Sequence, residues 1–263
     1  MQLEFSVNNV TQFSNWLKRF SSIDKSLLLE VDLDTLQFIA KTYNEERSVV
    51  KHSTISFTDI GFELVTKKLP TGRIHVGLYD VLKIIKTFNQ FAENFSFIIK
   101  YEDLEGNEDT KLIGKQLLLK NDNLKVGFDC TSLNIFKYIK DSVFNGAICK
   151  IDSLLTFDLK REDFDKIINL SDLDKEYKRI EFKAINSKIV LRSKSFELNL
   201  GICNGEKASM PILKDQLDKV DSENYSVQLG EGRMVLTSTD SDTTTALGGL
   251  DINEYDTDKD MDL

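Results

Sequence analysis

The sequence predicts an α+β fold built from two similar domains, in which antiparallel sheets carry two helices per domain. Many short runs of alternating or β-branched residues, separated by polar turns, indicate extended antiparallel sheet. Four short segments place their apolar residues on one helical face, as helices that cover a sheet do. Two sequence patterns also recur at regular distances, which indicates an internal duplication.

The length of 263 residues exceeds what one hydrophobic core usually holds, so two domains are expected. Apolar residues make up 41% and charged residues 29%, a balance typical of globular proteins. The net charge of −9 argues against a simple DNA-binding domain coated in basic residues. Much of that charge lies in 251–263, an acidic tail that we expect to be disordered because its carboxylates repel one another.

The duplication rests on two pairs of segments. Leu3–Val7, followed by an amphipathic segment, resembles Leu155–Leu159 at an offset of 152 residues. Glu93–Phe97 resembles Glu223–Val227 at an offset of 130, and each follows a second amphipathic segment. We therefore expect a first domain over 1–132, a connector over 133–153, a second domain over 154–250 and the tail over 251–263.

Hydrophobic periodicity predicts four helices, over about 9–22, over about 78–91, from Arg161 and from Pro211, a residue favoured at the first helical position. The residues expected to face the sheets are Val10, Phe13, Leu17 and Phe20; Leu78, Leu82, Ile85 and Phe88; Phe164, Ile167 and Ile168; and Leu213, Leu217 and Val220. Besides the two segments that open the domains, strands are expected at 27–31, 35–42, 48–57, 96–102, 111–119, 124–129, 179–184, 188–193, 196–202, 225–229 and 233–239.

The sequence offers few candidate residues for catalysis. His52 and His75 are the only histidines, and neither lies in a ligand-spaced cluster. The three cysteines, Cys130, Cys149 and Cys203, form no C-x-x-C pair, so neither a disulfide framework nor a zinc site is indicated. We expect no enzyme activity, no cofactor and no metal. The absence of a signal peptide or apolar span predicts a cytoplasmic protein with no membrane partner.

One local pattern points to a family. Lys83-Ile84-Ile85-Lys86, followed by the strand Phe95–Asp103, resembles the DNA polymerase sliding clamps, meaning proliferating cell nuclear antigen and the T-even phage clamp. The resemblance extends to the layout of nearly the whole chain. The size of the chain and its economical layout favour the bacteriophage branch of the family, which would place the protein in the host cytoplasm.

The resemblance implies a homotrimeric ring with continuous sheets outside and twelve helices around a central channel. Such a ring encircles double-stranded DNA without reading its sequence and acts as a processivity factor for DNA polymerase. The implied partners are DNA, the polymerase, a clamp loader and two further copies of the chain.

Cations on the predicted helices are the candidate DNA contacts, because flexible phosphate contacts allow sliding whereas base-specific hydrogen bonds would stop it. The candidates are Lys18, Arg19, Lys83, Lys86, Lys160 and Lys166. The ordinary alternative for any one of them is a solvated surface lysine. The fourth helix fits poorly, because Asp215, Asp218 and Asp221 offset its lysines.

The connector is too apolar for a free linker. In clamps the connecting segment borders a pocket for partner peptides, which the C-terminal segment completes, so the resemblance implies a partner site formed by Phe136, Tyr138, Leu247 and Leu250. The alternative is an ordinary packed helix or strand over 133–144. Two other functions also stay open: a non-ring viral processivity factor of the same fold, and a structural or assembly protein without a DNA function.

Overall fold

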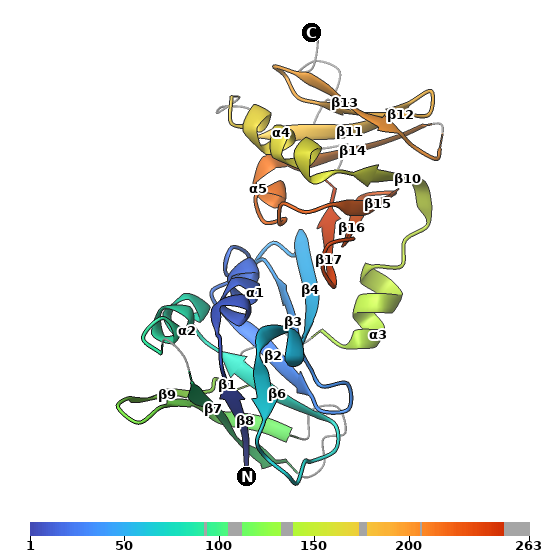
Figure 1. The fold of residues 1–263 in the computed structure, drawn as a ribbon. Helices are drawn as coiled ribbons and strands as arrows, with labels where there is room; N and C mark the ends of the chain where they lie inside the picture. Colours follow the sequence, from blue (N-terminus) through green and yellow to red (C-terminus); the bar gives the residue numbers. More distant parts are fainter. Residues whose placement is uncertain (92–93, 105–111, 133–138, 174–177, 206, 250–263) are drawn as a thin grey trace. The chain divides into compact units, whose positions relative to one another are not determined.

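The computed structural model of the chain describes residues 1–91, 94–104, 112–132, 139–173, 178–205 and 207–249 (Figure 1). It divides into two compact units. Unit 1 comprises Met1–Thr42 and His52–Ile139, and unit 2 comprises Tyr43–Lys51 and Lys140–Leu263. The expected limits at 132, 153 and 250 stay a prediction.

Among the described residues, unit 1 contains a sheet and two α-helices. Its elements are β1 (Gln2–Val7), α1 (Thr11–Ser21), β2 (Leu27–Asp32), β3 (Gln37–Tyr43), β4 (Val49–Ser56), the 3-10 turn η1 (Thr58–Ile60), β5 (Phe62–Leu64), β6 (Arg73–Leu78), α2 (Val81–Phe88), β7 (Phe95–Asp103), β8 (Leu112–Lys120) and β9 (Lys125–Asp129). The strand order is β4-β3-β2-β6-β8-β7-β1-β5, with β9 on β8. The β6–β8 pairing is parallel, and it joins the two halves of the unit.

Unit 2 repeats this plan. Its elements are α3 (Asp141–Val143), the π-helical turn η2 (Phe144–Ile148), β10 (Ser153–Leu159), α4 (Arg161–Ser171), β11 (Arg179–Ile185), β12 (Lys188–Arg192), β13 (Glu197–Ile202), β14 (Lys207–Leu213), α5 (Lys214–Leu217), β15 (Tyr225–Gly230), β16 (Arg233–Ser238) and β17 (Thr243–Gly248). Two strand orders result: β13-β12-β11-β14, and β10-β15-β16-β17.

The duplication is visible in the strand registers. Phe5 on β1 lies opposite Phe97 on β7, and Phe157 on β10 lies opposite Val227 on β15. These two pairs differ by 152 and 130 residues, the offsets found in the sequence. The order β4-β3-β2-β6 corresponds to β13-β12-β11-β14, and β9-β8-β7-β1 corresponds to β17-β16-β15-β10. The two units are therefore two copies of one arrangement of strands and helices.

The core of unit 1 is aromatic. Phe5 and Phe13 are both almost fully buried, and their rings lie 5.7 and 4.9 Å from that of Phe38. Phe13 on α1 also contacts Phe88 on α2, with ring centroids 5.8 Å apart, so the two helices pack against each other (Figure 1). Burial of side chains of this size stabilises the unit by about 1.5–3 kcal/mol each.

The core of unit 2 uses the equivalent positions with fewer rings. Phe164 on α4 and Tyr225 on β15 lie 6.0 Å apart, and Phe157 and Phe182 lie 6.2 Å apart. Leu217 on α5 is fully buried. The first predicted helix of each unit, α1 and α4, is present with the buried face that the periodicity indicated, except that Ile168 on α4 is half-buried.

The second helix of unit 1 is rotated relative to the prediction. Its buried residues are Val81, Ile84 and Phe88, whereas Leu82 is 44% exposed and Ile85 is half-buried. The apolar pairs at 81–82 and 84–85 fit two helical phases, and the periodicity alone does not choose between them. Asp80 decides, because its Oδ1 accepts a hydrogen bond from the Lys83 amide and starts the helix at Val81.

The fourth helix does not begin at Pro211. Pro211 lies in β14, opposite Glu181 of β11, and α5 begins at Lys214. β14 is at the end of its strand order, where a residue without an N–H group is tolerated. The predicted strand ranges include none of β5, β6, β14 and β17. No described helix is long and apolar enough to cross a membrane.

Candidate nucleic-acid interface

The basic residues of unit 1 lie on its two packed helices. Lys18 on α1 and Lys86 on α2 are exposed, and Arg19 is half-buried. Neither α1 nor α2 contains an acidic residue. In the part of the chain that the structure describes, Lys18 and Lys86 pair with no carboxylate. The outward side of this helix layer therefore presents cations without neutralising partners in either helix.

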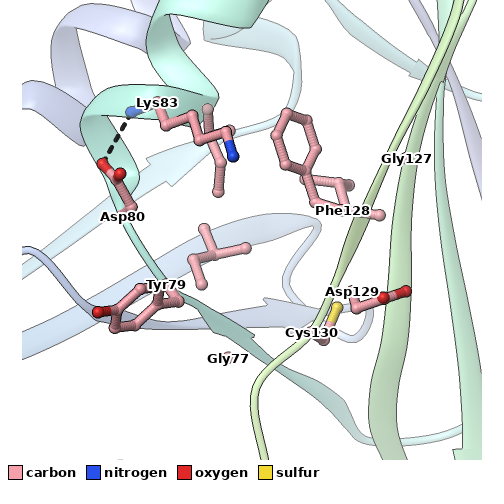
Figure 2. A pocket seen from close by; sticks show the side chains of 11 residues that line it. Gly77, Tyr79, Asp80, Lys83, Gly127, Phe128, Asp129 and Cys130 are labelled. Atoms are coloured by element: carbon pink, nitrogen blue, oxygen red, sulfur yellow. Dashed lines mark hydrogen bonds between the residues drawn. The ribbon is translucent and has the colours of Figure 1, made fainter.

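Lys83 occupies a different environment on α2. It is exposed, but it also lines a pocket that extends from the first turn of α2 to β9 (Figure 2). Figure 2 shows its side chain reaching from the helix toward Phe128. Lys83 therefore lines the pocket and also lies three residues before exposed Lys86 on the same helix.

The cations of unit 2 are balanced by nearby carboxylates. Lys166 Nζ lies 2.9 Å from Asp163 Oδ1, which raises the pKa of Lys166 above its ordinary value. Arg161 Nη2 lies 3.2 Å from Asp240 Oδ2. Lys160 is exposed and precedes α4 as its N-cap residue. The helix also carries Glu162 and Asp165, so its surface lacks the uniform positive charge of α1 and α2.

Of the four expected partner-binding residues, the described part of the chain contains one. Phe136, Tyr138 and Leu250 lie outside the described residues. Leu247 lies on β17 opposite Met234 and is fully buried. Its predicted place in the wall of a surface pocket is therefore wrong: an apolar residue near the end of a chain can equally be the inward side of a final strand, and here it is.

The described end of the connector is packed. Ile139 and Phe144 are 9% and 2% exposed, and α3 continues into η2. Arg233 donates hydrogen bonds from Nη1 to the carbonyl oxygens of Ala147 and Ile148. Over 139–148 the connector therefore forms short helical turns with two buried apolar side chains, and the choice between a partner site and an ordinary packed segment over 133–144 stays a prediction.

Solved structures with this architecture were found, although no protein-family model matches the sequence and no curated protein matches it. The PCNA of A. fulgidus, bound to the C-terminal region of FEN-1, is 10% identical, with a TM-score of 0.64, over 95% of this chain and 98% of that one. Proliferating cellular nuclear antigen of Entamoeba histolytica is 11% identical, with a TM-score of 0.64, over 95% and 99%. The DNA polymerase III beta chain of Streptococcus pneumoniae is 14% identical, with a TM-score of 0.66, over 98% and 67%.

The chain has the sliding-clamp fold. At these identities the likeness shows the fold alone. The chain spans nearly the full length of the two PCNA chains but about two thirds of the bacterial beta chain.

A buried charge cluster in this clamp fold was not predicted from the sequence. Glu30 on β2 is 1% exposed and lies 2.9 Å from Lys41 Nζ and 3.0 Å from Arg73 Nη1. Arg73 Nε also lies 2.8 Å from Asp32. The described residues contain no group of three or more His, Cys, Asp or Glu side chains arranged to hold a metal ion. The alternation of charged residues along 30–32 and 73–75 was the sequence signal that could have predicted this cluster. Its ion pairs connect β2, β3 and β6.

His75 lies beside this cluster on β6, opposite Glu30. Burial lowers the pKa of His75 below its ordinary value, although the Glu30 carboxylate opposes the shift. The unfolded chain therefore binds a proton at a pH where folded His75 stays neutral. Its contribution to stability is complete above the unfolded pKa, about 6.5, and is lost as the pH falls below that value.

Replacing His75 with glutamine should reduce the pH dependence of the stability of unit 1 between pH 7.5 and 5. Glutamine has a polar side chain of similar size but does not titrate, so the loss of stability on acidification becomes smaller. Hydrogen exchange of the β2 and β6 amides at both pH values measures the change. Identical pH dependence in the wild type and the variant would contradict this account, and the strands of unit 2 serve as an internal control.

Proposed function

We propose that this chain is a sliding clamp: a non-enzymatic ring that encircles duplex DNA and tethers a DNA polymerase. The carrying observation is the helix layer of unit 1, in which α1 and α2 pack side by side and contribute basic residues but no acidic ones. Lysine and arginine contacts to phosphates hold DNA without reading its sequence. That is the form of contact a sliding ring requires.

The proposed DNA contacts are unequal. Lys18, Arg19 and Lys86 carry most of the interaction, because neither helix of unit 1 holds a carboxylate to compete with the phosphates. Lys160 and Lys166 contribute less, because α4 carries its own acids. Lys83 also contributes to the DNA contact, in addition to lining the pocket.

Reversing Lys18 and Lys86 to glutamate should weaken binding to duplex DNA without changing the fold. Each lost phosphate contact lowers the slope of log affinity against log salt by about one, so the double variant should lose about two for each copy of the chain that contacts the DNA. Titration of a fluorescent linear duplex over a salt series measures the slope. Lys166→Glu is the matched control, since it reverses a lysine already paired with Asp163, and it should change the slope less. Equal slopes in the wild type and the double variant would remove α1 and α2 from the DNA surface.

The same proposal includes a ring of three copies. In the described part of the chain, β9 pairs with β8 alone and β13 pairs with β12 alone. These two strands correspond to β17 and β4, and within unit 2 the Gly248 amide of β17 donates a hydrogen bond to the carbonyl of Ser48, directly before β4. Pairing of β9 with β13 of the next copy repeats that joint, and such head-to-tail contacts close into a ring.

The mass in solution tests the ring directly. Three copies of the 30.1 kDa chain give about 90 kDa by light scattering at micromolar concentration. The trimer should persist as salt is raised, because backbone pairing between strand edges is less sensitive to screening than surface charges. A strictly monomeric species at all salt concentrations would reject the ring and leave a non-ring factor or an assembly protein.

The proposed partner site retains three of its four residues, Phe136, Tyr138 and Leu250, with DNA polymerase and a clamp loader as the proteins that use it. The PCNA structure that holds the C-terminal region of FEN-1 supports a peptide-binding role for this fold. One or two buried anchors usually dominate the binding of such peptides.

Replacing Phe136 and Leu250 together with alanine should abolish stimulation of the cognate polymerase in primer extension. Loss of two apolar contacts from a peptide site of micromolar affinity typically weakens binding by about 100-fold. DNA affinity and mass should stay at wild-type values, which separates this defect from a defect in the ring. Undiminished stimulation would move the partner site elsewhere.

A further inference from the structure

Unit 1 has an open pocket of about 290 Å³ beside the edge strand β9 (Figure 2). The end of β6, the first turn of α2, and parts of β8 and β9 enclose it. The residues that line it include Leu78, Lys83, Ile84, Leu117, Gly127 and Phe128. Phe128 is half-buried and Gly127 is exposed, so the wall formed by β9 faces solvent.

The duplication gives this pocket a counterpart in unit 2. In unit 1, Leu117 pairs with Phe128 across β8 and β9, and in unit 2, Met234 pairs with Leu247 across β16 and β17. When Phe97 on β7 is matched with Val227 on β15, the registers of β7–β8 and β15–β16 place Leu117 and Met234 at equivalent positions. The fourth residue of the second helix is buried in both units, as Ile84 in α2 and as Leu217 in α5.

In unit 2 the counterpart site is filled. Leu247, Met234 and Leu217 are fully buried, and Ala246, the counterpart of Gly127, is 4% exposed. The structure therefore contains one open and one occupied version of the same site, and the occupied version identifies the kind of segment that fits.

The segment Tyr43–Lys51 fills the site in unit 2. The Ser48 carbonyl accepts hydrogen bonds from the Gly248 amide at 2.8 Å and from Gln216 Nε2 at 3.2 Å. Gln216 is the third residue of α5, as Lys83 is the third residue of α2. Val49, the next residue of this segment, is fully buried. The filled site is therefore occupied by the first residue of a strand, Val49, together with the hairpin turn that precedes it.

The corresponding segment elsewhere in the chain is the hairpin between β12 and β13. In the β3–β4 hairpin the Asn44 amide donates to the Val49 carbonyl at 3.1 Å, and in the β12–β13 hairpin the Ser193 amide donates to the Phe196 carbonyl at 2.9 Å. Phe196 is therefore the counterpart of Val49, but it is only half-buried. It is an aromatic residue at a position that is fully buried in the other copy of the motif.

Charged side chains accompany both the pocket and the hairpin. The pocket is lined by the carboxylates of Asp80 and Asp129 and by Lys83. The hairpin carries exposed Lys194 two residues before Phe196 and exposed Glu197 directly after it. Each surface therefore offers both signs of charge for ion pairs with the other.

We propose that the pocket between α2 and β9 is a socket for the β12–β13 hairpin of a second copy of this chain, with Phe196 as the side chain that enters it. The inference rests on the proposed ring and specifies the residue that secures each joint. β9 and β13 supply backbone pairing, and the socket supplies the apolar anchor that fixes the register of that pairing.

Phe196→Ala should weaken self-association by about 30-fold or more, as expected for a buried aromatic anchor at an interface. Sedimentation over a concentration series measures this change, and Val65→Ala, at an apolar residue of unit 1 that is 50% exposed, is the control that should leave association unchanged. Circular dichroism verifies that Phe196→Ala stays folded.

A cross-linking variant tests the geometry independently of stability. Asp129→Cys with Ser195→Cys places thiols at the counterparts of Gly248 and Ser48, which lie in hydrogen-bond contact in unit 2. Mild oxidation should give disulfide-linked dimers and trimers, and each single variant should give fewer.

The outcomes separate the two proposals. A wild-type trimer with unchanged association of Phe196→Ala and no linked oligomers overturns the socket while the ring stands. A disulfide within a single chain overturns the second copy as the occupant. A monomeric wild type overturns the ring and the socket together.

Discussion

Antiparallel pairing of the first strand of each unit with the strand after its second helix is the interaction on which the rest of this structure depends. In unit 1, β1 joins β7, and the side chains of Leu3, Phe5 and Val7 are all fully buried. Because α1 follows β1 after three residues and α2 precedes β7, this one pairing fixes where both helices start and end on the sheet. A slip of one residue would turn the buried side chains of β1 outward.

The same pairing in unit 2, between β10 and β15, supports a chemically different surface. The first helices share a buried pattern, since Phe13 and Phe164 occupy equivalent places. Their outward faces share nothing comparable: α1 has basic residues alone, whereas Glu162, Asp163 and Asp165 accompany the cations of α4. Burial constrains the inner face of each helix and leaves the outer face to function. The two units thus keep one architecture with different electrostatic surfaces, and the DNA contact proposed here is concentrated in one of them.

The sequence predicted those elements whose apolar pattern admits a single solution. α1 and α4 were found because their apolar residues fit one helical phase. α2 was found with the wrong inner face, because Val81-Leu82 and Ile84-Ile85 offer two phases and the decision lies with the cap at Asp80. α5 has four residues, too few for any periodicity, and the proline before it belongs to an edge strand.

The site residues show the same division. Exposure of Lys18 and Lys86 followed from their helices, because a lysine opposite a buried face lies outside. The burial of Leu247 did not follow from its apolar character, since that character suits both a core strand and a pocket wall. The pocket beside β9 was beyond the reach of the sequence, because four separate elements form it and its meaning depends on comparing two strand registers.

Edge strands explain why such a pocket is useful to a protein built from repeated sheets. An unpaired edge accepts almost any other strand, and backbone hydrogen bonds alone do not select a partner or a register. β9 limits this hazard by its short length and by exposed Lys125 and Asp129 at its ends. A side chain that must enter a cavity next to the edge adds the missing selection, because a strand in the wrong register leaves the cavity empty and an aromatic ring exposed. Within the chain, Val49 next to β17 meets this requirement by complete burial. Between the copies of the proposed ring the requirement would be stricter, since the partners meet by diffusion and are not tethered, and the larger side chain at Phe196 fits that greater demand.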